Sequence, residues 1–181
     1  MLRSRPLGLL LLLCLPGLAL GSTMPPQTIA ELAGMSDRVV LARLGDSQIR
    51  VPGGNVRQMT TITRVEVQEE YRGKGPKALQ VVQLGGKHGL WESKVAGDAN
   101  LLVGQTALLF LRCPDPKAVE RCTLVGLAAS KLTLITGANG EREVELPRQI
   151  KGGPGRRALR EVIEEIRRAG PPPAKQERGQ R

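Results

Sequence analysis

Thr106-Ala-Leu-Leu-Phe-Leu111 is apolar at every position after its first residue. A strand with one face in water alternates apolar and polar side chains, and this stretch shows no such alternation. The sequence therefore predicts a central strand that is buried on both faces, with apolar partners supplied by the rest of the chain.

Further strands are predicted on both sides of this stretch. The run Gln58–Glu70 is rich in β-branched residues, but its apolar residues Ile62 and Val65 differ in parity. A bulge or bend between these two residues would bring both to one face. The other predicted strands are Arg38–Leu44, Leu79–Leu84, which Gly85-Gly86 should end, Cys122–Leu127, Lys131–Thr136 and Glu141–Leu146, with an irregular stretch at 87–104.

Two helices are predicted, one before and one after the strands. Thr28 and Glu31 have the spacing of a capping box, in which a hydroxyl and a carboxylate each accept a backbone N–H. Towards the C-terminus, an apolar stripe recurs at i, i+3, i+4 and i+7 and predicts an amphipathic helix. Its members are Leu159, Val162, Ile163 and Ile166. We expect the stripe to pack on the strands, because glutamates on the same helix weaken attraction to anionic lipid.

Six or seven short strands between two helices, without alternating strand–helix units, predict a mainly β fold. The expected architecture is a small antiparallel barrel or sandwich with a short N-terminal helix and an amphipathic C-terminal helix. The predicted organisation is a signal peptide at 1–21, a β-barrel domain at 22–147, a linker and amphipathic helix at 148–170, and a disordered basic tail at 171–181.

The N-terminus has the pattern of a secretory signal peptide. Two arginines precede the apolar stretch Leu7–Leu20, and small residues at 19 and 21 permit cleavage before Ser22. As a helix this stretch would rise about 21 Å, short of the roughly 30 Å hydrocarbon core of a bilayer. The sequence thus predicts a secreted or periplasmic protein with no stable membrane insertion.

Two cysteines remain after the predicted cleavage, Cys113 and Cys122. An exported chain reaches an oxidising compartment, where an even count at this spacing favours a disulfide. Pro114 and Pro116 on either side of Asp115 favour a turn between the two cysteines. A zinc site would need three or four ligands, which this segment does not offer. We therefore predict a Cys113–Cys122 disulfide.

The positive charge is concentrated in the C-terminal part of the chain. The whole sequence carries 27 basic and 17 acidic residues, a formal net charge of +10. Residues 22–147 hold 15 basic and 13 acidic residues, whereas residues 148–181 hold 10 and 4. A basic terminus either solubilises the chain or attracts it to an anionic surface, and charge alone leaves both open.

The order of short motifs resembles a group of exported bacterial proteins of uncharacterised role. The motifs are D-x-V-V at 37–40, T-x-x-x-V at 61–65, K-G at 74–75, V-V-x-x-G-G at 81–86, V-G-x-x-x-L-L-F-L at 103–111 and L-V-G at 124–126. This group is similar to netrin-like, or tissue-metalloproteinase-inhibitor-like, domains, and the resemblance implies a five-stranded OB-like barrel. In such inhibitors an N-terminal cysteine chelates the zinc of a protease. This chain has Ser22 at its predicted start and no early cysteine in the mature part, so that mechanism has no residue to carry it.

Few residues are candidates for catalysis. His88, the only histidine, lies in a glycine-rich stretch, and no G-x-S-x-G motif exposes a serine for it. Glu69 and Glu70 are adjacent on a strand and point to opposite faces, while the alternate glutamates of Glu141–Glu145 share the wet face of a predicted edge strand. Lys151–Gly155 lacks the G-K-[ST] ending of a phosphate-binding loop. We predict no catalytic, cofactor-binding or metal-binding residue.

The composition also narrows the partners. One Trp, one Tyr and one Phe are too few for stacking on bases, so no nucleic-acid partner is predicted. The leading hypothesis is an exported, non-enzymatic domain that binds or assists an unknown protein or envelope ligand. The second, from the netrin-like resemblance, is an inhibitor or accessory of an exported peptidase, and the third is an enzyme of unrecognised class.

Overall fold

Strand β5 (Thr106–Arg112) lies at the centre of the fold, as its apolar sequence predicts. The computed structural model describes residues 25–114 and 120–170. It pairs β5 with β1 (Arg38–Arg50) along one edge and with β6 (Arg121–Leu124) and β7 (Lys131–Thr136) along the other. Residues 107–111 are all fully buried. Because neighbouring side chains of a strand point to opposite faces, β5 separates two apolar cores.

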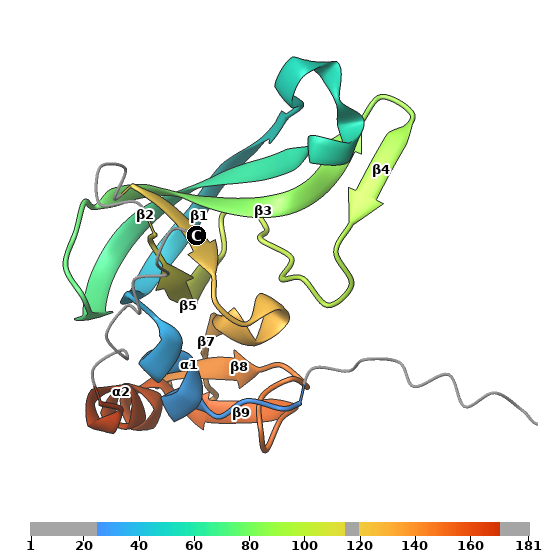
Figure 1. Ribbon diagram of the computed structural model, residues 1–181. Coiled ribbons are helices and arrows are strands. Elements are labelled where there is room, and N and C mark those ends of the chain that lie inside the picture. Colours follow the sequence, from blue (N-terminus) through green and yellow to red (C-terminus); the bar gives the residue numbers. More distant parts are fainter. Residues whose placement is uncertain (1–24, 115–119, 171–181) are drawn as a thin grey trace, which may run out of the picture.

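The first core fills a closed ring of five strands (Figure 1). The ring runs from β1 through β2 (Thr60–Arg72), β3 (Ala78–His88), β6 and β5 back to β1. Its neighbours pair antiparallel except for β3 and β6, which are parallel. A closed ring leaves no unpaired strand edge. The predicted mainly β, OB-like barrel is confirmed, with this one parallel pairing.

The second core lies on the other face of β1 and β5. It is bounded by α1 (Ile29–Met35), β7, β8 (Arg142–Leu146), β9 (Gly155–Ala158) and α2 (Leu159–Arg168), and the two helices lie side by side (Figure 1). The α2 residues Leu159, Val162 and Ile166 are buried in this core. The amphipathic stripe therefore packs against the strands as predicted, and residues 148–170 belong to the same folded unit as the barrel.

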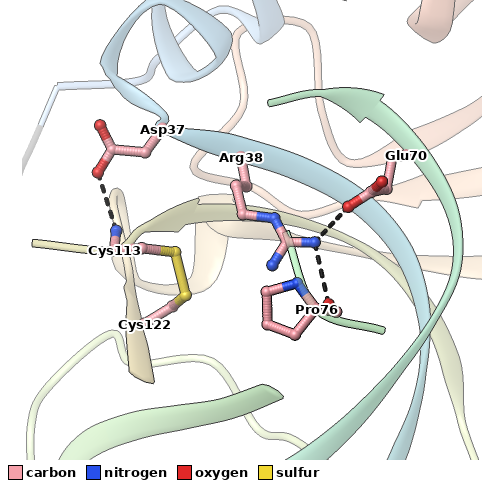
Figure 2. Close-up of a disulfide and its surroundings, with 6 residues drawn as sticks. All are labelled: Asp37, Arg38, Glu70, Pro76, Cys113 and Cys122. Carbon is pink, nitrogen blue, oxygen red and sulfur yellow. Dashed lines mark hydrogen bonds and ion pairs between the residues drawn. A yellow bond between two sulfur atoms is a disulfide. The ribbon is translucent and has the colours of Figure 1, made fainter. Parts of the chain in front are cut away.

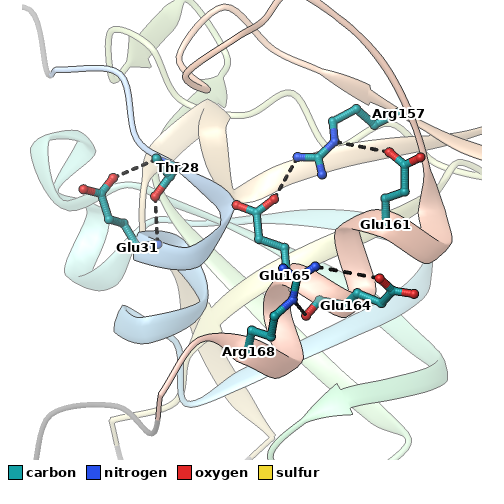
Figure 3. Close-up of polar contacts among 7 residues, drawn as sticks. All are labelled: Thr28, Glu31, Arg157, Glu161, Glu164, Glu165 and Arg168. Atoms are coloured by element: carbon teal, nitrogen blue, oxygen red, sulfur yellow. Dashed lines mark hydrogen bonds and ion pairs between the residues drawn. The ribbon is translucent and has the colours of Figure 1, made fainter.

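The capping box at the start of α1 is present (Figure 3). Thr28 Oγ1 accepts a hydrogen bond from the Glu31 N–H at 3.1 Å, and Glu31 Oε2 accepts one from the Thr28 N–H at 2.7 Å. The hydrogen bond from the Thr28 backbone lowers the pKa of Glu31, because it favours the charged carboxylate.

Three predictions concern residues outside the described ranges. They are the signal peptide at 1–21 with cleavage before Ser22, the turn around Asp115, and the basic tail at 171–181. Within residues 25–114 and 120–170, no helix has the length and apolar character needed to cross a bilayer.

Strand β9 is missing from the sequence prediction, which assigns its residues to a linker. Its four residues, Gly-Arg-Arg-Ala, show no alternation of their own. They are extended because β8 offers an edge to pair with, and Glu145 lies opposite Arg156 and Glu143 opposite Ala158. Strand β8 pairs with β9 along one edge and with β7 along the other. The prediction that Glu141–Leu146 forms an edge strand is therefore wrong.

The predicted bulge lies in β1 and not in β2. The pairing of β2 with β3 is regular from Thr60 to Glu66. Two β1 residues, Gly45 and Asp46, instead lie opposite the single residue Arg64. Between Ile62 and Val65 strand β2 stays regular because Thr63 takes the buried position, with its hydroxyl 2.9 Å from that of Ser47. A buried hydroxyl is tolerated once it is hydrogen-bonded.

Strand β3 bends at Gly85-Gly86 and continues, although the sequence predicts that it ends there. Up to Leu84 it pairs with β2, and from Gly85 onwards it pairs with β4 (Trp91–Lys94). Gly85 has φ 90°, and a Cβ on it would lie 2.3 Å from the Ser93 carbonyl oxygen. Only glycine permits this close passage. Residues 85–94, part of which the sequence predicts as irregular, thus form a β-hairpin, which we call the arm.

Gly85→Ala is expected to weaken the arm by about 1–3 kcal/mol, because the new Cβ adds a clash to an unfavourable φ. Amide hydrogens of β4 should then exchange roughly ten- to a hundredfold faster. Gly89→Ala is the matched control, since Gly89 also has a positive φ, of 58°, but a Cβ there meets nothing within 4 Å. Equal exchange rates in the two variants would contradict the assigned clash.

Candidate functional site

The predicted disulfide joins the end of β5 to β6 (Figure 2). The Sγ atoms of Cys113 and Cys122 are 2.06 Å apart. The carboxylate of Asp37 accepts a hydrogen bond from the Cys113 N–H at 2.9 Å. Asp37 opens the D-x-V-V motif, so the conformational role of this motif residue is to tie the start of β1 to the bridged segment.

Arg38, the next residue, carries a buried charge (Figure 2). Its side chain is 4% exposed, forms an ion pair with Glu70 and donates a hydrogen bond to the Pro76 carbonyl at 3.2 Å. A Cβ on Gly75 would lie 2.7 Å from the guanidinium, so the K-G motif leaves room for the arginine. These contacts hold the loop between β2 and β3 against β1. Asp37 of the D-x-V-V motif and Gly75 of the K-G motif thus have structural roles.

Of the residues considered for catalysis, Glu69 and Glu141 line one hollow, whereas His88 lies on the arm. The His88 side chain is exposed and makes no hydrogen bond or ion pair with any described residue. Glu69 and Glu70 bond to different partners, Arg142 and Arg38, as expected for adjacent residues of a strand. Lys151 lies in a turn where its N–H bonds to the Gln27 carbonyl. In the part of the chain that the structure describes, no three potential metal ligands come together.

Glu69, Tyr71 and Arg142 form a polar cluster beside a hollow of about 400 Å³. The Tyr71 hydroxyl donates to Glu69 at 2.7 Å, and Arg142 donates to the other oxygen of the same carboxylate at 2.7 Å. The hydrogen bond from Tyr71 lowers the pKa of Glu69. Burial and the hydrogen bond to Glu69 raise the pKa of Tyr71 to about 12. The phenol is thus held neutral and serves as a donor, which is a structural role.

Titration of Tyr71 tests this cluster, because it is the only tyrosine of the chain. We expect about a tenth of the phenol to be ionised at pH 11 in the folded protein, against most of it in the unfolded chain. Since the folded pKa is the higher one, the contribution of Tyr71 to stability is complete below pH 10 and is lost as the pH rises towards 12. Ultraviolet absorbance measures the ionised fraction. A midpoint near pH 10 in folded protein would refute the cluster, and Glu69→Gln should remove part of the shift.

Arg157 of β9 and two arginines of α2 form ion pairs with glutamates (Figure 3). Arg157 contacts Glu165 at 2.9 Å and Glu161 at 3.9 Å. Two further pairs, Arg160–Glu141 at 3.2 Å and Arg168–Glu164 at 3.7 Å, complete the set. Much of the positive charge at α2 is thus paired with glutamates, and the helix buries Leu159, Val162 and Ile166 in the fold.

Exposed apolar side chains gather at the end of the barrel where β1 turns into β2 and β3 turns into β4. We call this surface the barrel end and define it as residues 49–59, which turn from β1 to β2, together with residues 84–94. The two segments are adjacent, because Thr60 pairs with Leu84 and the Gly85 N–H bonds to the Met59 carbonyl (Figure 1). Four of the six large apolar residues exposed in the described chain lie here, namely Ile49, Leu84, Leu90 and Trp91.

The basic side chains of the barrel end have no acidic partner. Those side chains are Arg50, Arg57, Lys87 and Lys94, all exposed, and none forms an ion pair with a described residue. Glu92 is the one acidic residue of these two segments, which gives four positive charges against one negative. The surface thus combines exposed apolar side chains with free positive charge.

Of two hollows along β1, β2 and β3, the smaller adjoins the barrel end and the larger lies outside it. A groove of about 620 Å³ crosses β1, β2 and β3, and its charges are balanced, with Arg43, Arg64 and Lys77 against Asp46, Glu66 and Glu120. A hollow of about 260 Å³ lies beside the arm and includes Ser47, Thr61, Thr63 and Gln83. Neither hollow has the charge imbalance that the barrel end has.

No protein family and no curated protein matches this sequence. The assignment of the candidate site therefore depends on the structure alone. The sequence contained one signal for the arm that the prediction missed: Gly89-Leu90 forms a two-residue turn between His88 and Trp91. Two-residue loops that begin with a glycine of positive φ are typical of β-hairpins.

Proposed function

We propose that this chain is an exported, non-enzymatic binding domain of the cell envelope and that the barrel end is its binding surface. The observation that carries the proposal is the exposure of apolar side chains there. Leu90 is fully exposed, and Leu84 and Trp91 are 70% and 64% exposed. Gathered apolar side chains rimmed by charge mark interaction sites, and tryptophan is enriched where binding energy is concentrated.

Other observations support the remaining parts of the proposal. The signal-peptide pattern at 1–21 supports export, and so does the Cys113–Cys122 pair, because disulfides persist in oxidising compartments. The His88 side chain forms no ion pair or hydrogen bond with a described acidic residue, which supports a binding role over a catalytic one. An OB-like barrel hosts many kinds of ligand, so the partner has to be inferred from the surface and not from the fold.

The test is capture from an envelope extract of the producing cells. The immobilised protein should retain envelope material, and a Leu84→Ser, Leu90→Ser, Trp91→Ser variant should retain about a tenth of it or less. The matched control carries Leu102→Ser and Val103→Ser, which remove two apolar side chains that are exposed elsewhere. Equal capture by both variants would refute the barrel end as the binding surface.

A further inference from the structure

The barrel end carries positive charge that no ion pair within the described chain compensates. Its two segments carry four basic side chains and one carboxylate, and none of the four forms an ion pair with a described residue. By contrast, Arg157 of β9 and Arg160 and Arg168 of α2 each contact a glutamate. Uncompensated positive charge on one surface favours an anionic partner.

The apolar side chains of the barrel end stand at a protruding tip. Leu90 occupies the turn of the arm and Trp91 follows it at the start of β4. Figure 1 shows the arm projecting from the barrel beside the β1–β2 turn. A protein partner would need a pocket shaped to receive such a turn. The headgroup region of a bilayer receives it without a preformed shape.

The arrangement of apolar and basic side chains along the arm also fits a bilayer surface. Leucine and tryptophan are at the tip, and Lys87 and Lys94 lie nearer to the barrel. Tryptophan is favoured at the membrane–water interface, where its ring meets both lipid and water. Lysine and arginine close to the interface are attracted by anionic headgroups. No spanning helix is needed for this mode of attachment, since apolar side chains enter only the interfacial layer.

We propose that the barrel end docks on the surface of an anionic bilayer, with Leu90 and Trp91 in the headgroup region and the four basic side chains against lipid phosphates. The inference rests on the proposed function, because it names the partner of the same binding surface. Glu92 opposes this attraction, so its removal should strengthen binding, which a purely structural role for the arm would not predict.

The fluorescence of Trp91 tests the proposal directly, because it is the only tryptophan of the chain. Vesicles of equal parts phosphatidylglycerol and phosphatidylcholine should shift its emission to shorter wavelength and carry the protein down on sedimentation. Pure phosphatidylcholine vesicles should bind it at least about tenfold more weakly, and added salt should weaken binding to the anionic vesicles.

Variants assign the binding to the arm. Leu90→Ser, and separately Lys87→Gln with Lys94→Gln, should each weaken binding to anionic vesicles about tenfold, whereas Glu92→Gln should strengthen it. Val103→Ser is the matched control, since Val103 is exposed outside the barrel end, and it should bind like the unaltered protein. All these positions are exposed, and circular dichroism should confirm that the variants stay folded.

Each outcome is decisive. Absence of both the emission shift and sedimentation overturns the bilayer proposal, and so does vesicle binding that Leu90→Ser and the lysine variant leave unchanged, since another part of the chain then binds. If vesicles fail while capture from the envelope extract still depends on Leu84, Leu90 and Trp91, the proposed function stands with a protein as its partner. If that capture fails as well, both proposals are refuted.

Discussion

Ile166→Asp is expected to lower the free energy of unfolding by about 4 kcal/mol. Ile166 is 1% exposed and lies in the second core with Ile29, Leu32 and Val162. Truncating a buried isoleucine costs about 2–5 kcal/mol. The carboxylate adds to this cost, because it must stay charged among apolar groups or take up a proton. Domains of this size have total stabilities of about 5–15 kcal/mol, so at least about a quarter of the stability is removed. Urea unfolding followed by circular dichroism measures the change.

Arg167→Asp is the control for this prediction. It introduces the same side chain at the neighbouring position of α2, where the arginine is exposed and forms no ion pair with a described residue. Since the change reverses a charge in the last turn of the helix, a loss of about 1 kcal/mol is expected, well below that of Ile166→Asp. Similar losses in the two variants would show that α2 does not pack as described, and Ile166→Asp would then reflect helix charge alone.

The parts of this fold that the sequence predicts are those whose signal is contained within a few residues. The apolar run of β5 requires burial on both faces wherever it pairs. The capping box depends on Thr28 and Glu31, three residues apart, and the α2 stripe depends on a helical period within ten residues. In each case the local pattern agrees with the tertiary packing, so the element can be predicted from its own segment alone.

The missed elements depend on partners that lie elsewhere in the chain. Gly155–Ala158 is extended because it pairs with the edge of β8. The four residues Gly-Arg-Arg-Ala have no pattern of their own that predicts a strand. The bulge in β1 depends on how Gly45 and Asp46 meet Arg64 across the pair. The continuation of β3 depends on Gly85, because a Cβ at this position would clash with the Ser93 carbonyl oxygen of β4. Register between strands is a property of the pair, which a single stretch does not reveal.

The barrel end could not be predicted from the sequence, because it too depends on pairing between separate segments. The charge count singles out residues 148–181, yet Arg157, Arg160 and Arg168 have glutamate partners in the folded chain. The 15 basic and 13 acidic residues of 22–147 look balanced in sequence. Pairing of β3 with β4 then gathers the free lysines and the exposed Leu90 and Trp91 at one end. Surface chemistry of this kind emerges only after the strands are placed.

Cys113→Ser is expected to lower the free energy of unfolding by about 2.5–3 kcal/mol. The two cysteines are nine positions apart, and the loop-closure entropy of such a short loop has about this value. The measurement is urea unfolding without reductant. Reduction of the unaltered protein should reproduce the loss, and the variant should be insensitive to reductant, which separates the bridge from any effect of the serine itself. Equal stability of oxidised and reduced protein would contradict the prediction.

The position of the bridge adds a local expectation to this global one. Strand β6 closes the barrel, yet it shares only two register positions with β3 and two with β5. The disulfide fastens β6 to the end of β5, so its loss should loosen the seam between β6 and β3. Amide exchange distinguishes the two effects. The Gln80 amide, which bonds to the Glu120 carbonyl at 2.6 Å, should gain more exchange than amides of β1 and β2. A uniform increase would mean that the bridge acts on the unfolded chain alone and that the ring closes without it.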